Sequence, residues 1–248
     1  MSGFVSLVGA GPGDAELLTV RAVDRLRRAD LVLYDALTPE ELLSLAPQAK
    51  RFYVGKRAGR HSIDQEGIHR LMVRAASRGE RVVRLKCGDP FVLGRGGEEA
   101  LALEAAGIAY EVVPGLSSAI AAPALAGIPV THRGLSAGFA VLSGHTAEHI
   151  GAIAPGSLTL VVLMGLRTRG DLAQTLIARG WSPSTPAAII LGASHEGSTR
   201  WLGTVETHAS ASIDSDLPGI IVVGAVVELA TQIANDYTGA EALAVRTS

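Results

Sequence analysis

The sequence predicts an α/β protein built of two α/β domains, and three observations support this. The chain has 248 residues, of which 48% are hydrophobic and 19% charged, a composition typical of a folded protein with a sizeable core. Short runs rich in β-branched residues alternate with longer segments of helical period, which indicates largely parallel sheets. A Pro-Gly pair ends one such run near the middle. We therefore expect domains over residues 1–114 and 115–240, followed by a loose tail over 241–248.

Four apolar runs in the first half predict strands, over residues 4–8, 31–34, 81–86 and 109–113. Helices are expected over 17–28, from residue 62 onward, and over 98–106. The first has apolar residues at helical spacing, and the second opens with a pattern typical of a capping box, Ser62 to Gln65. Gly107 is suited to end the third, because glycine readily adopts the left-handed conformation found after helices.

The second half repeats this rhythm. Strands are expected over residues 139–143, 158–163, 187–191 and 220–223, and a helix over 171–179 that ends at Gly180. Residues 201–207 are more polar and predict an antiparallel strand. No internal repeat and no low-complexity segment is evident.

Charge and cysteine usage exclude several classes of protein. The formal net charge is −2, which argues against a nucleic-acid binder, since such proteins normally carry a basic excess. The single cysteine, Cys87, cannot form a disulfide within the chain or a cysteine-built zinc site. The seven histidines show no metal-ligand spacing, so we expect no metal.

The sequence also argues against membrane insertion. Its start lacks the basic region of a secretory signal. The longest uncharged stretch, residues 112–131, contains three prolines and is a poor candidate for a membrane span. We therefore expect a cytoplasmic protein without a membrane partner.

Candidate ligand-binding residues follow the predicted strands, because open α/β sheets bind ligands beyond the carboxyl ends of their strands. The turn at Gly9 to Asp14 has the spacing G-x-G-x-G rather than the G-x-G-x-x-G of dinucleotide folds, which argues against NAD. It could be a ligand turn or a plain tight turn. Asp35 ends the second strand and could be a loop or capping residue, or a general base.

Two further segments are rich in features of ligand loops. The first is a basic run without acidic residues, which could be a solvated face or a site for a polyanion. Its members are Arg51, Lys56, Arg57, Arg60 and His61. The segment from residue 86 to residue 99 combines four glycines, a proline and fixed charges between a strand and a helix. Glycines there would let the backbone approach a ligand closely.

These segments together resemble the tetrapyrrole methylase family. The matching residues are Val8–Asp14 with Leu17–Thr19, Tyr34–Asp35, Val54–Gly59 with His61–Ser62 and Gln65, Arg81–Lys86, Gly88–Phe91, Gly94–Glu99, Glu111–Gly115, Ala126–Pro129, Thr131–Gly134, Met164–Gly165 and Thr185–Ala187. The likeness covers nearly the whole chain and is densest up to Gly144.

The resemblance implies a homodimer of two-domain chains, with S-adenosylmethionine in a cleft between the domains. It implies two methyl transfers to uroporphyrinogen III, at C2 and C7, that give precorrin-2 for siroheme or cobalamin synthesis. S-adenosylhomocysteine is the implied product of each transfer. A methylase acting on a later precorrin is the main alternative. A nucleotide-binding module without chemistry and an NAD oxidoreductase are further alternatives.

The resemblance also assigns site residues. It implies Asp35 as a base and Lys56 as an acid. It implies cofactor contacts at Pro12, Cys87, Gly88, Asp89, Val92, Ser117, Ser118, Met164, Ala193 and Ile220. The cationic loops suit a substrate with eight carboxylates, through Arg57, Arg60, His61, Arg95, His132 and Arg133. The family pattern has two glycines before Asp89, whereas this chain has Cys87-Gly88, and a side chain at that position requires a negative φ.

Overall fold

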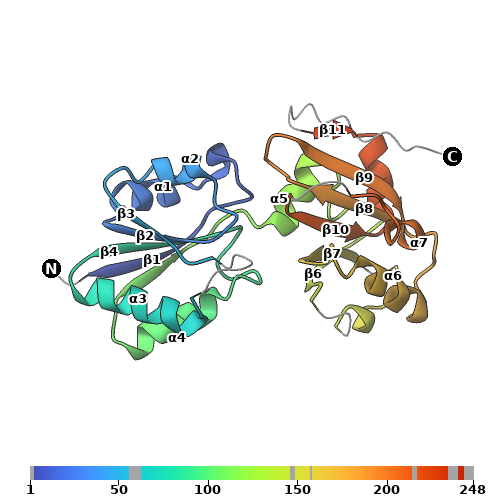
Figure 1. The fold of residues 1–248 in the computed structure, drawn as a ribbon. Helices are drawn as coiled ribbons and strands as arrows, with labels where there is room; N and C mark the ends of the chain where they lie inside the picture. The colour runs from blue at the N-terminus through green and yellow to red at the C-terminus, as the bar shows by residue number, and fades with distance from the viewer. Residues whose placement is uncertain are drawn as a thin grey trace. The chain divides into compact units, whose positions relative to one another are not determined.

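The computed structural model describes residues 3–55, 63–145, 149–156, 158–213, 217–233 and 240–242. The chain divides into two compact units, Met1–Ser117 and Ser118–Ser248 (Figure 1). Each unit contains a β-sheet with helices packed on it, so the predicted α/β class is confirmed. The predicted boundary after residue 114 stays a prediction, and most of the predicted tail lies outside the described residues.

Unit 1 is built on a five-stranded parallel sheet with the strand order β3-β2-β4-β1-β5. The strands are β1 (Phe4–Gly9), β2 (Leu31–Tyr34), β3 (Lys50–Tyr53), β4 (Arg81–Lys86) and β5 (Tyr110–Val113). The helices are α1 (Val20–Arg27) and α2 (Glu40–Ser44) on one face, and α3 (Gln65–Ser77) and α4 (Gly96–Ala105) on the other (Figure 1). Because all five strands run in one direction, their carboxyl ends share one edge of the sheet.

Side-chain caps decide where the helices of unit 1 begin. The Thr19 hydroxyl accepts a hydrogen bond from the Ala22 amide at 3.2 Å, so α1 starts after Thr19, and the 3-10 helix η1 (Ala15–Leu17) precedes it. The prediction of a single helix from residue 17 is therefore wrong at its start. Asp64 caps α3 by accepting from the Gly67 amide at 2.7 Å, whereas the predicted cap, Ser62, lies outside the described residues.

Unit 2 contains a mixed six-stranded sheet with the order β11-β9-β8-β10-β7-β6. The strands are β6 (Phe139–Ser143), β7 (Thr159–Leu163), β8 (Pro186–Leu191), β9 (Ser198–Thr204), β10 (Gly219–Val223) and β11 (Ala240–Ala242). The prediction of a largely parallel sheet is wrong for this half, because β10 lies between β7 and β8 and runs antiparallel to both. The predicted antiparallel strand is confirmed as β9, but it ends at Thr204.

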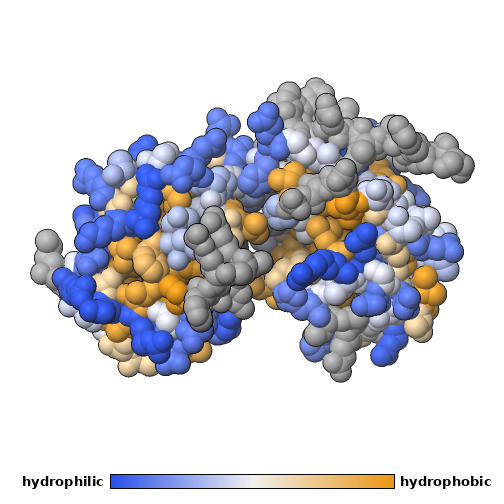
Figure 2. All heavy atoms as spheres, in the orientation of Figure 1, coloured by the Kyte–Doolittle hydropathy of each residue, from blue (hydrophilic) through white to orange (hydrophobic). Residues whose placement is uncertain are grey.

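Helices cover both faces of the second sheet. The helical elements are α5 (Ser118–Leu125), η2 (Ile150–Ala152), α6 (Arg169–Ala178), α7 (Val205–His208) and η3 (Ala225–Thr231). α6 and α7 pack with one set of strand side chains, and α5 and η3 pack with the other. Figure 2 shows apolar surface among the hydrophilic side chains of each unit. Within the described residues, no helix has both the length and the apolar character that crossing a bilayer requires.

His208, at the end of α7, is a buried titratable group whose environment favours the neutral ring. Its Nδ1 lies 2.7 Å from the Val205 carbonyl oxygen, and its Nε2 is buried with no hydrogen-bond partner among the described residues. Burial lowers the pKa of His208. The unfolded chain, with a histidine pKa of about 6.5, then binds more protons than the folded chain just below that pH.

We therefore expect the stability of the chain to fall as the pH falls from about 7 through the pKa of His208 in the folded state. A His208→Gln variant should lose less free energy of unfolding between pH 7.5 and 5.5 than the parent, as measured by urea titration at each pH. The exposed His149→Gln is the matched control and should keep the parent's pH dependence. Equal pH dependence in the parent and His208→Gln would contradict this expectation.

Candidate active site

Three loops of unit 1 meet backbone to backbone at the carboxyl edge of its sheet. The amide of Gly11 donates to the Gly88 carbonyl at 3.2 Å, and the amide of Gly88 donates to the Gly11 carbonyl at 2.8 Å. A Cβ atom on Gly9 would lie 2.6 Å from both the Cα of Gly115 and the carbonyl oxygen of Gly88. The loops after β1, β4 and β5 can therefore approach this closely only because they present glycine to one another.

The side chain of Asp89 links the loop after β4 to the loop after β5 through hydrogen bonds. Its Oδ1 accepts a hydrogen bond from the Phe91 amide at 2.8 Å, and its Oδ2 accepts from the Gly115 amide at 3.1 Å. Both carboxylate oxygens thus bind backbone amides of the chain itself. Ligand contacts made by the loop after β4 would then depend on its backbone and on the neighbours of Asp89.

Backbone conformations with positive φ at non-glycine residues also occur in loops that follow strands. Among the described residues, the non-glycine residues with positive φ are Leu93, Arg95, Met164 and Ser194, with φ values between 53° and 70°. Leu93 and Arg95 lie in the loop after β4, Met164 follows β7, and Ser194 lies after β8. Such conformations cost free energy and occur most often at ligand-binding and catalytic sites.

Asp35 follows β2 and is held by a buried arginine of β4. Nη2 of Arg84 lies 2.8 and 2.9 Å from the two carboxylate oxygens of Asp35. The Arg84 side chain is only 3% exposed, whereas that of Asp35 is 31% exposed. Arg84 also donates to the carbonyl oxygens of Leu33 and Leu85. The carboxylate of Asp35 is therefore fixed in position and still accessible at the sheet edge.

The other side of Arg84 contacts Glu99 of α4, whose side chain is fully buried. Oε1 of Glu99 accepts hydrogen bonds from Arg84 Nε at 3.0 Å, Lys86 Nζ at 3.0 Å and Gln65 Nε2 at 3.1 Å. Burial and the charge of Arg84 lower the pKa of Lys86. Burial opposes the charged form of Arg84 as well, but Glu99 and Asp35 together raise its pKa. The cluster holds two cations against two carboxylates.

Cys87 begins the loop after β4 and has a backbone that tolerates a side chain. It is absent from the residues with positive φ, whereas Gly88 has a φ of 65°. The glycine of the family pattern is therefore not required at this position by conformation. Burial raises the pKa of the Cys87 thiol to about 11.

A pKa of about 11 means that about one thiol in a thousand is ionised at pH 8, far fewer than in an unfolded chain. We expect iodoacetamide to alkylate Cys87 slowly in the native protein at pH 8, and much faster in urea-unfolded protein, which is the matched control. The rate in the native protein should rise with pH up to about pH 11. A rate that levels off at or below pH 9 would contradict a partly buried thiol that stays neutral at pH 8.

In unit 2, three strand ends meet at one edge of the sheet. β7 ends at Leu163, which pairs with Ile220 near the start of β10, and β8 ends at Leu191, which pairs with Gly219. The antiparallel β10 therefore begins where its two neighbours end. The predicted cofactor residues that this arrangement gathers at one edge are Met164, Ala193 and Ile220. Met164 is 45% exposed, whereas Ile220 is only 5% exposed and lies in the core.

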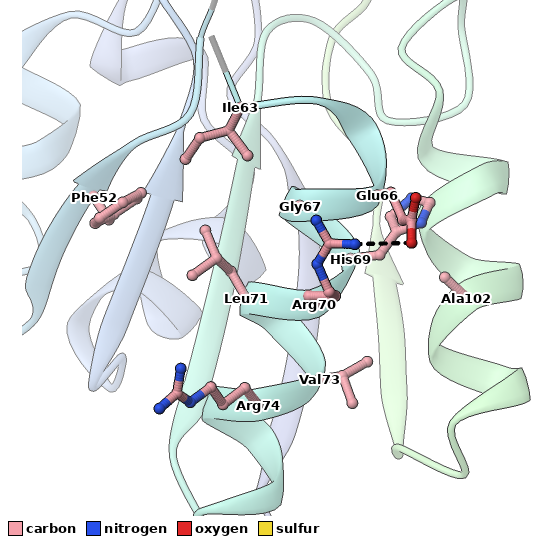
Figure 3. A pocket seen from close by; sticks show the side chains of 10 residues that line it. All are labelled: Phe52, Ile63, Glu66, Gly67, His69, Arg70, Leu71, Val73, Arg74 and Ala102. Carbon is pink, nitrogen blue, oxygen red and sulfur yellow. Dashed lines mark hydrogen bonds and ion pairs between the residues drawn. The ribbon is translucent and has the colours of Figure 1, made fainter. Parts of the chain in front are cut away.

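A groove of about 670 Å³ lies on unit 1 along α3 (Figure 3). It is lined by Phe52, Ile63, Glu66, Gly67, His69, Arg70, Leu71, Val73, Arg74 and Ala102. Arg70 and Glu66, one turn apart on α3, form an ion pair of 2.8 Å. None of the predicted site residues in the described part of the chain lines this groove. The described residues contain no group of three histidine, cysteine, aspartate or glutamate side chains placed to hold a metal.

Comparison with known proteins assigns the chain to a family. The profile of the Tetrapyrrole (Corrin/Porphyrin) Methylases matches residues 5–209. The chain belongs to this family. A uroporphyrinogen-III C-methyltransferase of Methanocaldococcus jannaschii is 45% identical over 243 residues, covering 92% of this chain and 98% of that protein.

Two further relatives agree with the assignment. The solved structure of a Thermus thermophilus uroporphyrin-III C-methyl transferase complexed with S-adenyl homocysteine matches with a TM-score of 0.80 and 42% identity, over 92% of this chain and 100% of that one. Siroheme synthase 1 of Serratia proteamaculans is 44% identical over 238 residues, covering 94% of this chain. The chain spans about half the length of the siroheme synthases it matches.

The structure brings most of the described site residues to strand ends. In unit 1 these are Pro12, Asp35, Cys87, Gly88, Asp89, Val92 and Arg95, and Ser117 closes the unit. In unit 2 they are Met164, Ala193 and Ile220, while Ser118 begins α5. His132 and Arg133 precede β6 in unit 2, on an exposed turn closed by hydrogen bonds between His132 and Ser136. Lys56, Arg57, Arg60 and His61 lie outside the described residues.

Sequence reasoning assigned no role to the charged residues that hold Asp35 from the interior of unit 1. Arg84 and Lys86 occupy alternate positions at the end of β4, so they point to the same face of the sheet. Two cations on the buried face of a central strand require a buried carboxylate, which Glu99 provides. The alternation in β4 was the available signal, but its partner could be found only once α4 was placed.

Proposed function

We propose that the chain is an S-adenosylmethionine-dependent C-methyltransferase that methylates uroporphyrinogen III at C2 and C7 to give precorrin-2. The activity and substrate are those in the names of its relatives. The observation that carries the proposal is the placement of Asp35, a fixed and accessible carboxylate on the same sheet edge as the glycine turns.

The residues of the chain fit S-adenosylmethionine. When bound, this cofactor supplies a methyl group from its sulfonium sulfur. Gly11 and Gly88 have φ values of 68° and 65° and carry no side chain, so their backbones are open to close approach by a ligand at the loops after β1 and β4. Met164, which is exposed and polarisable, suits the adenine or the methionine portion. The proposed contacts also include Pro12, Cys87, Asp89, Val92, Ser117, Ser118, Ala193 and Ile220.

The chemistry needs little from the protein besides positioning and one base. The nucleophile would be an electron-rich pyrrole carbon, which needs no activating side chain, so holding the substrate in alignment with the bound cofactor would supply much of the rate. The methylated ring must then lose a proton. Asp35 accepts it, because its carboxylate is held by Arg84 and remains accessible. Lys56 is proposed as the matching acid.

The substrate has an apolar macrocycle with eight carboxylates around it. Large apolar side chains are exposed in the loops at the carboxyl edge of the first sheet, namely Leu37, Phe91, Leu93 and Leu116. They suit the face of a macrocycle. Arg57, Arg60, His61, Arg95, His132 and Arg133 are the proposed partners of its carboxylates. We further propose that the chain acts in the cytoplasm as a homodimer.

The test is anaerobic incubation of the purified chain with S-adenosylmethionine and uroporphyrinogen III, with S-adenosylhomocysteine release as the readout. The proposal expects two S-adenosylhomocysteine molecules for each tetrapyrrole. The oxidised porphyrin is the matched control and should give none, because its rings are no longer isolated pyrroles. Release with a later precorrin but not with uroporphyrinogen III would instead support the alternative methylase. Tight binding of NAD in place of S-adenosylhomocysteine would contradict both.

A further inference from the structure

We propose that Glu99 is a positioning residue for methyl transfer, acting through Arg84 to hold the carboxylate of Asp35 in its working orientation. The proposal rests on the proposed function, because it takes Asp35 to be the base. Glu99 itself is fully buried and lies beneath Arg84, so it contacts no reacting atom in this arrangement.

The geometry of Arg84 couples the two carboxylates. A guanidinium group is planar and rigid, so fixing one of its nitrogens orients the others. Glu99 accepts from Nε at 3.0 Å, and Asp35 accepts twice from Nη2 at 2.8 and 2.9 Å. A shift of the Arg84 side chain would therefore move the donor that aligns both oxygens of Asp35.

Glu99 is in turn fixed by elements on the same face of the sheet. Lys86 of β4 and Gln65 of α3 donate hydrogen bonds to Oε1 of Glu99, the same atom that accepts from Arg84. Gln65 Nε2 lies 3.3 Å from Nε2 of His69, which lines the groove of Figure 3. The carboxylate of Glu99 thus links α3, α4 and β4. Because Arg84 contacts both Glu99 and Asp35, these elements together restrict the position of the Asp35 carboxylate.

Stability alone does not require this arrangement. Replacing a buried ion pair with apolar residues of similar size is often neutral or stabilising, so buried charges are weak evidence for a purely structural role. One oxygen of the Glu99 carboxylate accepts from Arg84, Lys86 and Gln65, while the other has no partner among the described residues. Burying a polar atom without a hydrogen bond costs free energy, so this arrangement is less stable than a fully partnered one would be. It does give Arg84 one defined position.

The test is a double-mutant cycle with a charge-matched variant. Lys86→Met combined with Glu99→Leu removes one cation and one anion, and leaves the pair of Arg84 and Asp35. We expect this variant to keep its thermal unfolding midpoint and its KM for S-adenosylmethionine, and to lose kcat by about tenfold to a hundredfold. The same two substitutions in an Asp35→Asn background should change kcat little further, because the base they position is gone. Glu104→Gln, an exposed change on the same helix, is the control and should behave as the parent.

The outcomes separate the inference from the proposed function. Equal losses of kcat with and without Asp35 would overturn the inference alone, and so would an unchanged kcat. A parent chain without methyl transfer overturns the proposed function, and the inference with it. If the charge-matched variant unfolds, Glu99→Gln replaces it in the same cycle, since its amide oxygen can still accept from Arg84. A smaller loss that again depends on Asp35 would then support the role, and one independent of Asp35 would overturn it.

Discussion

Replacing Asp35 with asparagine is expected to lower kcat for methyl transfer by about a hundredfold or more, while leaving the Kd for S-adenosylhomocysteine unchanged. A positioned general base contributes typically about 10²- to 10⁴-fold. Asparagine keeps the size of the side chain and can still accept one hydrogen bond from Arg84, but it cannot take up a proton. The measurement pairs steady-state kinetics with calorimetric titration of S-adenosylhomocysteine.

The control for this change is Asp171→Asn, an exposed position in the first turn of α6. It removes the same charge from the chain but lies in unit 2 and is none of the proposed site residues, so we expect parental turnover. Parental turnover in Asp35→Asn as well would remove Asp35 from the proposed chemistry. A matched loss of cofactor affinity would make Asp35 a binding residue instead.

Adding one methyl group at Gly9 is expected to have the second largest effect. The new Cβ would lie 2.6 Å from the Cα of Gly115 and from the carbonyl oxygen of Gly88, so the three loops must separate. Overpacking of this kind costs about 1–3 kcal/mol. We expect Gly9→Ala to lower the free energy of unfolding by about that amount, and to weaken S-adenosylhomocysteine binding, because the displaced loops include the proposed contacts at Pro12 and Gly88.

Gly170→Ala is the matched control for this glycine. Gly170 lies in α6, and a Cβ there would meet nothing within 4 Å. Alanine in a helix is favoured over glycine by about 0.5–1 kcal/mol, so this variant should be as stable as the parent or more stable. If Gly9→Ala matches it in stability and affinity, the close packing of the three loops is not needed for the site.

The fold of unit 1 could be predicted closely because local patterns and topology agree there. The run at residues 81–86 forms β4 with the predicted bounds, and the glycine turns after β1 and β4 lie at the sheet edge where an open parallel sheet places ligands. Helix starts were less certain, since Thr19 and Asp64 decide them through single capping bonds.

The arrangement of unit 2 could not be predicted in the same way. A strand such as β10 is a short apolar run, and its sequence does not reveal the direction in which it pairs. Its antiparallel insertion between β7 and β8 brings Ile220 beside the ends of its neighbours, where Met164 and Ala193 follow. That juxtaposition comes from tertiary pairing and not from local propensity.

The charged cluster beneath Asp35 also depends on tertiary structure. Arg84 and Lys86 are visible in the sequence as charges in a strand, but Glu99 is one of three glutamates of α4, and the sequence does not show that it is the buried one. Only the packing of α4 on β4 brings the three together. The site residues in loops that follow strands can therefore be predicted from the sequence. The buried ion pairs between elements far apart in the sequence cannot.

The most direct test of the proposed activity is the fate of the methyl group. The purified chain is incubated without oxygen with uroporphyrinogen III and S-adenosylmethionine carrying a ¹³C-labelled methyl group, and the tetrapyrrole is examined by mass spectrometry and NMR. We predict a product with two labelled methyl groups, at C2 and C7. A tetrapyrrole that gains no label, from protein that binds S-adenosylhomocysteine, would contradict uroporphyrinogen III as the substrate.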